Sequence, residues 1–180
     1  VEKLEFNDLN KIKPIVKDYS KKNKVVPIVL TKKELVNSSD VFPLELLDMK
    51  YPHKVLFGED IIDEIELDKK HVRRQLEFEL RSKLIHLREN YIWLKKDKEL
   101  KELLKSAVPT LMPLFYGLLF LKDKDIPANL DSLFEEVERA YKIDLKLFKE
   151  IKEDRITNES IDIKRLMTLL YELIHIVDKM

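Results

Sequence analysis

The second half of the chain carries apolar residues at spacings of three and four, which is the period of an amphipathic helix. The clearest stripe follows Asp68, a residue type that commonly caps helices, and extends to about Lys96. It consists of Val72, Leu76, Leu80, Leu84, Leu87, Tyr91 and Leu94. The pattern predicts one helix of about 28 residues, which is about 40 Å long at the usual rise per residue.

Further helical segments follow with short connections between them. The next contains Leu100 to Leu111, and we expect it to kink or end near Pro109 and Pro113 because proline lacks an amide hydrogen. Apolar residues at helical spacing then recur in three more segments, at 133–141, 145–151 and 166–177. Five helical segments in residues 67–180 predict an up-and-down helical bundle domain.

Residues 1–66 have a different pattern, with short segments separated by prolines. Apolar positions from Leu9 to Tyr19 predict a first helix, and Thr31 with Glu34 forms a capping box for a short helix that ends near Asn37. The apolar segments 24–30 and 41–49 predict two strands, and 54–57 a third short apolar piece. The predicted fold class is therefore α+β, mainly α: a small α/β segment over 1–66, followed by the bundle.

Two carboxylates, Glu45 and Asp48, interrupt the second predicted strand. A buried acid is unfavourable unless a cation, a donor or a metal pairs with it. Because side chains alternate along a strand, these two acids would point to opposite faces. Two interpretations stay open: an edge-strand glutamate that reaches solvent or a lysine, or a carboxylate from a two-metal site.

The order of elements here, with the runs FPLELLD (42–48) and VLFGED (55–60), resembles the third-strand region of the polymerase-beta-type nucleotidyltransferases. It resembles more closely a bacterial group of nucleotidyltransferase-domain proteins, whose helical half is similar to RSKLIHLRENYI (81–92) and to 103–121. The resemblance implies transfer of a nucleoside monophosphate from a nucleoside triphosphate to an unknown acceptor. It also implies two magnesium ions held by three carboxylates, with Glu45 as the third acid and metal ligand and Asp48 as a weaker candidate.

The chain departs from that family in the rest of the site. It contains no Gly-Ser dipeptide and no upstream acid-x-acid pair, and Phe42 stands where the second acid should follow Ser39-Asp40-Val41. We therefore expect this chain alone to bind no magnesium tightly and to transfer no nucleotide. A truncated α/β segment would leave a strand edge open, which predicts a homo-oligomer formed through 24–30 or 41–49.

Two other classes of function remain. One is a non-enzymatic helical interaction module. The other is a HEPN-type RNA-cleaving bundle, because Arg81 and His86 match its loose signature. Residues five apart diverge by about 140° around a helix, which favours a solvated arginine and a histidine on the flank instead. The basic residues in 69–74 could face a phosphate, but we interpret them as a solvated surface.

Composition narrows the choice of partners and compartment. There are 34 basic and 34 acidic residues, so the net charge of zero gives no strong signal for nucleic acid or for an anionic membrane. The absence of cysteine excludes disulfides and thiolate metal sites. The run from Leu111 to Leu121 is too short to span a bilayer, and a soluble, cytoplasmic protein is predicted. Charged residues at 38% and only two glycines resemble the composition of thermophile proteins.

Overall fold

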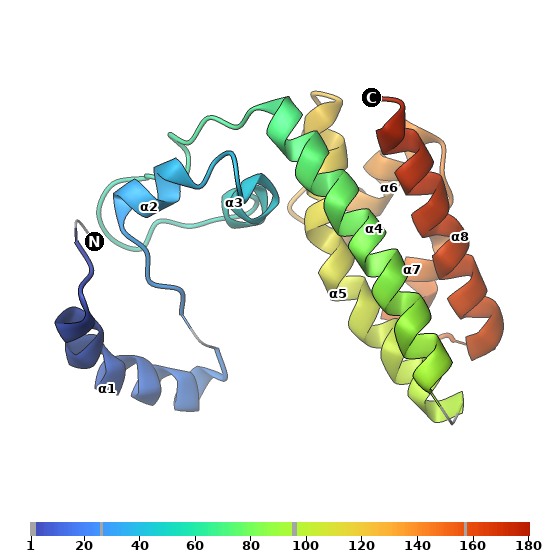
Figure 1. Ribbon diagram of the computed structural model, residues 1–180, viewed down its shortest axis with the longest axis horizontal. Helices are drawn as coiled ribbons and strands as arrows, with labels where there is room; N and C mark the ends of the chain where they lie inside the picture. Colours follow the sequence, from blue (N-terminus) through green and yellow to red (C-terminus); the bar gives the residue numbers. More distant parts are fainter. Residues whose placement is uncertain (1–2, 26, 95–96, 157) are drawn as a thin grey trace. The chain divides into compact units, whose positions relative to one another are not determined.

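The structure is a computed structural model that describes residues 3–25, 27–94, 97–156 and 158–180. Within these ranges it contains eight helices and no strand (Figure 1). The chain divides into two compact units, Val1–Ser39 and Asp40–Met180. The boundary predicted at residues 66 and 67 therefore lies inside the larger unit.

The smaller unit contains α1 (Phe6–Asn23) and α2 (Lys32–Asn37). Both helices start with reciprocal caps: the Thr31 hydroxyl accepts the Glu34 amide at 3.0 Å, and the Glu34 carboxylate accepts the Thr31 amide at 2.7 Å. These two helices confirm the sequence prediction. The predicted strand at 24–30 is wrong for its described residues, which form no strand, and Val26 lies outside the described residues. A strand needs a paired neighbour, and the described residues offer none.

The larger unit begins with α3 (Pro43–Lys50), where the sequence pattern predicted a strand over 41–49. Pro43 is at the first helical position, where its missing amide hydrogen is harmless. A short continuous apolar run fits a buried helix as well as a strand, and here Leu44 and Leu47 share the buried face of a helix. The predicted α/β segment is not seen in the described residues, and the predicted association through a strand edge loses its basis.

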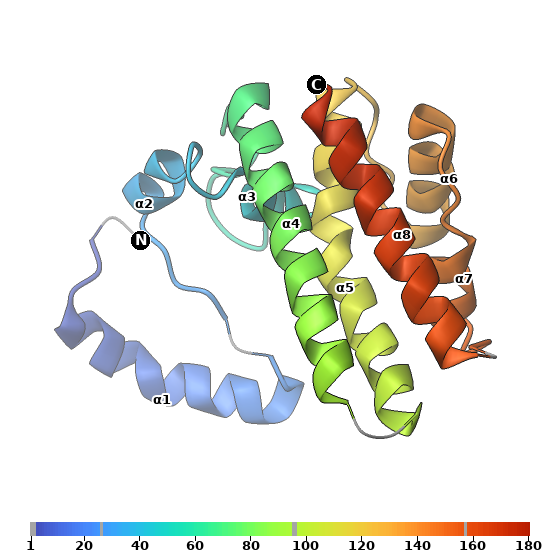
Figure 2. The same cartoon turned by 45° about the vertical axis from the view of Figure 1, so that its right-hand side comes forward.

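The bundle consists of α4 (Lys69–Trp93), α5 (Asp97–Leu121), α6 (Leu130–Tyr141), α7 (Lys146–Lys152) and α8 (Glu159–Asp178). These five helices confirm the prediction of a mainly helical protein. As Figures 1 and 2 show, α4, α5 and α8 run side by side, and α5 also packs on α3, α6 and α7. Asp68 caps α4 as predicted, with its carboxylate accepting the Lys70 amide at 2.7 Å.

Three fully buried phenylalanines from three helices form the centre of the core. Phe115 of α5 meets Phe134 of α6 and Phe148 of α7 edge to face, with ring centroids 5.9 and 5.2 Å apart. At the other side of α5, a β-carbon on Gly117 would lie 2.5 Å from a methyl carbon of Leu44. The glycine therefore lets α3 lie close to α5.

Helix α5 continues through both Pro109 and Pro113, so of the two expected outcomes, a kink or an end, neither proline ends the helix. The stretch Glu99–Leu121 is long and apolar enough to cross a membrane. The sequence prediction considered only the run from Leu111 to Leu121, which is too short to do so. Half of the most apolar window of Glu99–Leu121 is buried inside the bundle. Because the core helix of a soluble protein has the same composition, this is weak evidence for a membrane span.

Candidate functional site

Glu45, the predicted metal ligand, lies in the first turn of α3 and is exposed. Its Oε2 accepts a hydrogen bond of 2.6 Å from the side-chain amide of Gln75 on α4. The carbonyl oxygen of the same amide accepts the backbone N–H of Leu44 at 2.8 Å. Glu45 thus holds Gln75 in the orientation that caps the start of α3, where free amide hydrogens need partners.

Asp48 lies one turn further along α3, also exposed, and therefore on the same side as Glu45. The prediction that the two acids point to opposite faces is wrong, because the segment is a helix. Partial desolvation and then repulsion from Glu45 raise the pKa of Asp48. Among the described residues, no group of three or more histidines and carboxylates is placed to hold a metal ion. The role of Glu45 as a metal ligand, and the expectation that this chain alone binds no magnesium tightly, both stay predictions.

Arg81 and His86 bind different partners. The Arg81 guanidinium donates to both carboxylate oxygens of Asp178 on α8, at 2.7 and 2.9 Å, and to Glu77 at 3.2 Å. His86 lies 3.0 Å from the Glu89 carboxylate and lines a hollow of about 250 Å³ among α4, α5 and α8. The structure does not bring the two side chains to one point, and the RNA-cleaving class stays a prediction.

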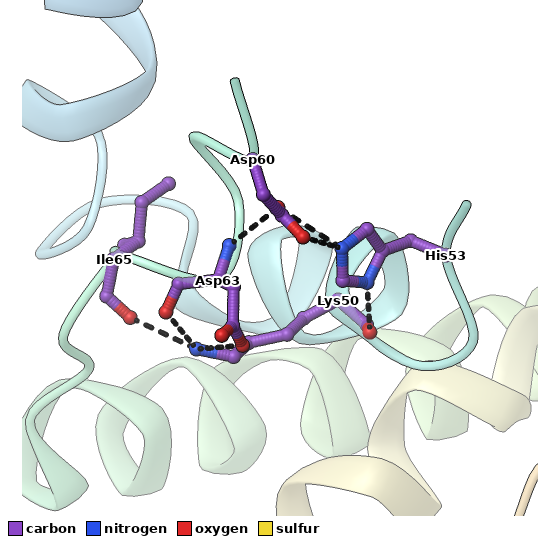
Figure 3. Close-up of polar contacts among 5 residues, drawn as sticks. All are labelled: Lys50, His53, Asp60, Asp63 and Ile65. Atoms are coloured by element: carbon purple, nitrogen blue, oxygen red, sulfur yellow. Dashed lines mark hydrogen bonds and ion pairs between the residues drawn. The ribbon is translucent and has the colours of Figure 1, made fainter. Parts of the chain in front are cut away.

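The loop after α3 is closed by a cluster of charged side chains (Figure 3). Lys50 Nζ donates to the backbone carbonyls of Asp63 at 2.8 Å and Ile65 at 3.3 Å. His53 Nε2 lies 2.9 Å from Asp60 Oδ2, and the other oxygen of Asp60 accepts the Asp63 amide at 3.1 Å. These contacts join the two ends of the loop.

Both ring nitrogens of His53 face acceptors, since Nδ1 is 2.9 Å from the Lys50 carbonyl oxygen. A neutral imidazole has one N–H, so only the charged ring donates to both. The hydrogen bond that His53 donates to the Asp60 carboxylate, and next the one to the Lys50 carbonyl, raise the pKa of His53. The His53 hydrogen bond and the Asp63 amide lower the pKa of Asp60. Both pKa shifts favour the charged forms of His53 and Asp60, and this pair therefore holds the loop closed.

The exposed side of α4 carries an apolar row that the sequence analysis missed. Phe78, Ile85 and Ile92 are 66%, 51% and 79% exposed. Residues seven apart on a helix point in directions that differ by only about 20°. The three side chains therefore form a column, which spans fourteen residues and is about 21 Å long. We call it the outer stripe. It lies opposite the buried stripe formed by Val72, Leu76, Leu80, Leu84 and Leu87.

The same seven-residue spacing sets the two flanks of the outer stripe. Arg74, Arg81 and Arg88, all exposed, form an arginine column on the side toward α8. Arg81 pairs with Asp178, and the Arg88 guanidinium lies 5.1 Å from the ring centroid of Tyr171. The flank toward α3 carries Gln75, Ser82 and Glu89. The exposed face of α4 is therefore apolar in the middle and basic on one side only.

The N-terminal end of the outer stripe opens into a surface hollow of about 350 Å³. It is lined by Asp40, Val41, His71, Arg74, Gln75 and Phe78. Val41 and the adjacent Phe42 are about half exposed, at 56% and 51%. The hollow thus has a mixed lining, with Val41 and Phe78 apolar and the other four residues polar or charged. A signal for this face was present in the sequence, since Phe78, Ile85 and Ile92 recur at a spacing that the core stripe does not use.

Comparison of the chain with protein-family models, with curated proteins and with solved structures gives no match. The site therefore rests on its own geometry.

Proposed function

We propose that this chain is a helical interaction module that binds another protein through the outer face of α4. The observation that carries the proposal is the outer stripe of Phe78, Ile85 and Ile92. Single exposed apolar residues are common and need no explanation. Three in register on one helix, about 10 Å apart along its axis, form an apolar row that a single partner can cover, and exposed apolar residues gathered in this way are a feature of interaction surfaces.

The outer stripe is not used to hold the fold together. α4 is anchored by its opposite face, where Val72, Leu76 and Leu80 are fully buried. Covering a phenylalanine or isoleucine side chain contributes about 1.5 to 3 kcal/mol relative to leaving it in water. Because α4 is already folded and its inner face is anchored in the core, a partner would gain part of this contribution from each half-exposed side chain without ordering the helix first.

The resemblance to nucleotidyltransferases supports a rival proposal less well. That interpretation depends on Glu45 reaching a metal from a strand. In the structure Glu45 lies on a helix and bonds to the Gln75 amide. The contact gives Glu45 a role in capping α3, whichever function the protein has.

The proposal is tested by site-specific photo-crosslinking of the full-length chain in cells. A crosslinking amino acid at Ile85 samples the outer stripe, and the same amino acid at exposed Glu135 on α6 is the matched control. We expect a discrete protein adduct from position 85 and none from position 135. The captured protein is then purified and titrated against the unmodified chain and the triple variant Phe78→Gln, Ile85→Gln, Ile92→Gln.

Loss of binding in the folded triple variant supports the proposal. Equal binding by both chains, or adducts of the same kind from positions 85 and 135, contradicts it.

A further inference from the structure

We infer that the partner segment is an acidic amphipathic helix, which lies along the outer stripe with its carboxylates toward Arg74 and Arg88. The inference rests on the proposed function and specifies the class of partner. It is carried by the three parallel rows on the outer face of α4 and by the hollow at one end of them.

The shape of the surface favours a helix as the ligand. The outer stripe is straight, about 21 Å long and repeats every seven residues. A second helix crossing at a shallow angle of about 20° places its own apolar residues at that repeat. At the end of the stripe, the hollow of about 350 Å³ has room for one large side chain of the partner, which would contact Val41 and Phe78 on its apolar side.

The charge of the flanks favours acidic residues on the partner. Arg74 and Arg88 make no ion pair with a carboxylate among the described residues, whereas Arg81 is already paired with Glu77 and Asp178. The two unneutralised guanidinium groups are fourteen residues apart on α4, which is about 21 Å. Glu89 lies on the opposite flank and disfavours acids there. The charge pattern thus fixes which side of the partner helix is acidic.

Other occupants fit these observations less well. A second copy of the chain that docked antiparallel through the same face would bring two arginine columns together, and like charges in contact are unfavourable. A second copy that docked in parallel would set the arginine column against Gln75, Ser82 and Glu89, which carry only one carboxylate. A nucleic acid would meet the arginines but would leave the apolar row without a matching surface. An anionic membrane would be expected to attract a face with cations on both flanks, and here only one flank is basic.

The test uses synthetic helical peptides and the full-length chain. Three fluorescent peptides of about three heptads share one apolar face and carry glutamate, glutamine or lysine on one flank. Fluorescence anisotropy measures their binding to the chain at low and high salt. We expect the glutamate peptide to bind at least about tenfold more tightly than the lysine peptide. Its affinity should fall as sodium chloride rises from about 50 to about 500 mM.

Charge-reversed variants identify the arginines responsible. Arg74→Glu with Arg88→Glu should reverse the order, so that the lysine peptide binds more tightly. Lys164→Glu with Lys179→Glu changes the net charge equally at exposed lysines in the last helix and its cap, and should leave the order unchanged. Circular dichroism melting curves of both double variants, compared with the unmodified chain, confirm that each is folded.

Each outcome bears on one of the two claims. Equal binding of all three peptides, lost in the triple glutamine variant, would keep the helix-docking surface and overturn its acidic preference. Binding of no peptide would overturn the inference, while the crosslink at position 85 would still decide the proposed function. Tighter binding to phosphatidylserine vesicles or to single-stranded RNA than to the glutamate peptide would overturn it in favour of those ligands. A homodimer of the unmodified chain that is lost in the triple glutamine variant would also overturn the inference, because the occupant would then be a second copy of the chain.

Discussion

The two faces of α4 carry similar apolar side chains in very different surroundings. On the inner face, Leu76 and Leu80 are enclosed by neighbouring helices, and the residue between them, Phe78, is largely in water. Removing an enclosed side chain leaves a cavity, whereas removing an exposed one leaves none. The contrast separates residues that determine the fold from residues that are available to a partner.

The largest expected effect is on the inner face. Leu80→Ala should lower the free energy of unfolding by about 3 kcal/mol, because a fully buried leucine is lost and a cavity remains. Urea denaturation followed by circular dichroism measures the change. A loss below about 1 kcal/mol would mean that the bundle does not enclose this side of α4.

A smaller effect is expected from pH at the loop after α3. Folding raises the pKa of His53 above its usual 6.5, so its contribution to stability is present below that value and is lost as pH rises through the raised pKa. Folding lowers the pKa of Asp60 below its usual 3.8, so its contribution is lost only as pH falls through the lowered value. The loop should be held most firmly between these limits.

Hydrogen exchange of the amides in 51–66 tests this expectation. After correction for the intrinsic dependence of exchange on pH, protection in the unmodified chain should fall as the pH rises above 6.5, the usual pKa of histidine. In His53→Gln, protection should be lower at about pH 6 and should not change as the pH rises. A pH dependence that persists in the variant would show that another group is responsible.

A still smaller effect on stability is expected on the outer face. The triple variant Phe78→Gln, Ile85→Gln, Ile92→Gln should unfold within about 0.5 kcal/mol of the unmodified chain. The side chains are exposed, and glutamine favours a helix at least as well as isoleucine or phenylalanine. The same urea experiment measures it beside Leu80→Ala. A loss approaching that of Leu80→Ala would place the outer stripe inside the core.

An equally small effect on stability is expected at Glu45. Glu45→Gln keeps an oxygen that can accept the Gln75 amide, so stability should change by less than about 0.5 kcal/mol. Calorimetric titration with magnesium or manganese should show no tight site in either chain. A micromolar site that disappears in Glu45→Gln would restore the nucleotidyltransferase interpretation.

Helical periodicity predicted much of the bundle, because the pattern of buried and exposed positions along a helix can be read from a short stretch of sequence. Asp68 and the stripe from Val72 to Leu87 gave the start of α4 and its buried face correctly. The segment around Glu45 failed for a physical reason: eight residues of apolar character suit a short helix or a buried strand equally. The packing of Leu44 against Gly117 and the Gln75 cap on the Leu44 amide favour the helix, and both contacts join distant parts of the chain.

The candidate site was harder to predict for two separate reasons. The outer stripe was visible in the spacing of Phe78, Ile85 and Ile92. The buried stripe from Val72 to Leu87 was sufficient to predict α4 as a core helix, so the second row was not sought. The His53 cluster has no periodic signal, because Asp60 reaches His53 and Asp63 reaches Lys50 only when the loop closes. Contacts of that kind depend on the path of the backbone between the residues.

The central claim is that the outer face of α4 binds a partner while the inner face does not change. Methyl NMR of the full-length chain, with labelled isoleucine and leucine, follows both faces during one titration with the glutamate peptide. We predict shifts of the Ile85 and Ile92 methyl signals and unchanged signals from Leu76 and Leu80. Unshifted outer methyls at saturating peptide, or shifts confined to the inner leucines, would contradict the account.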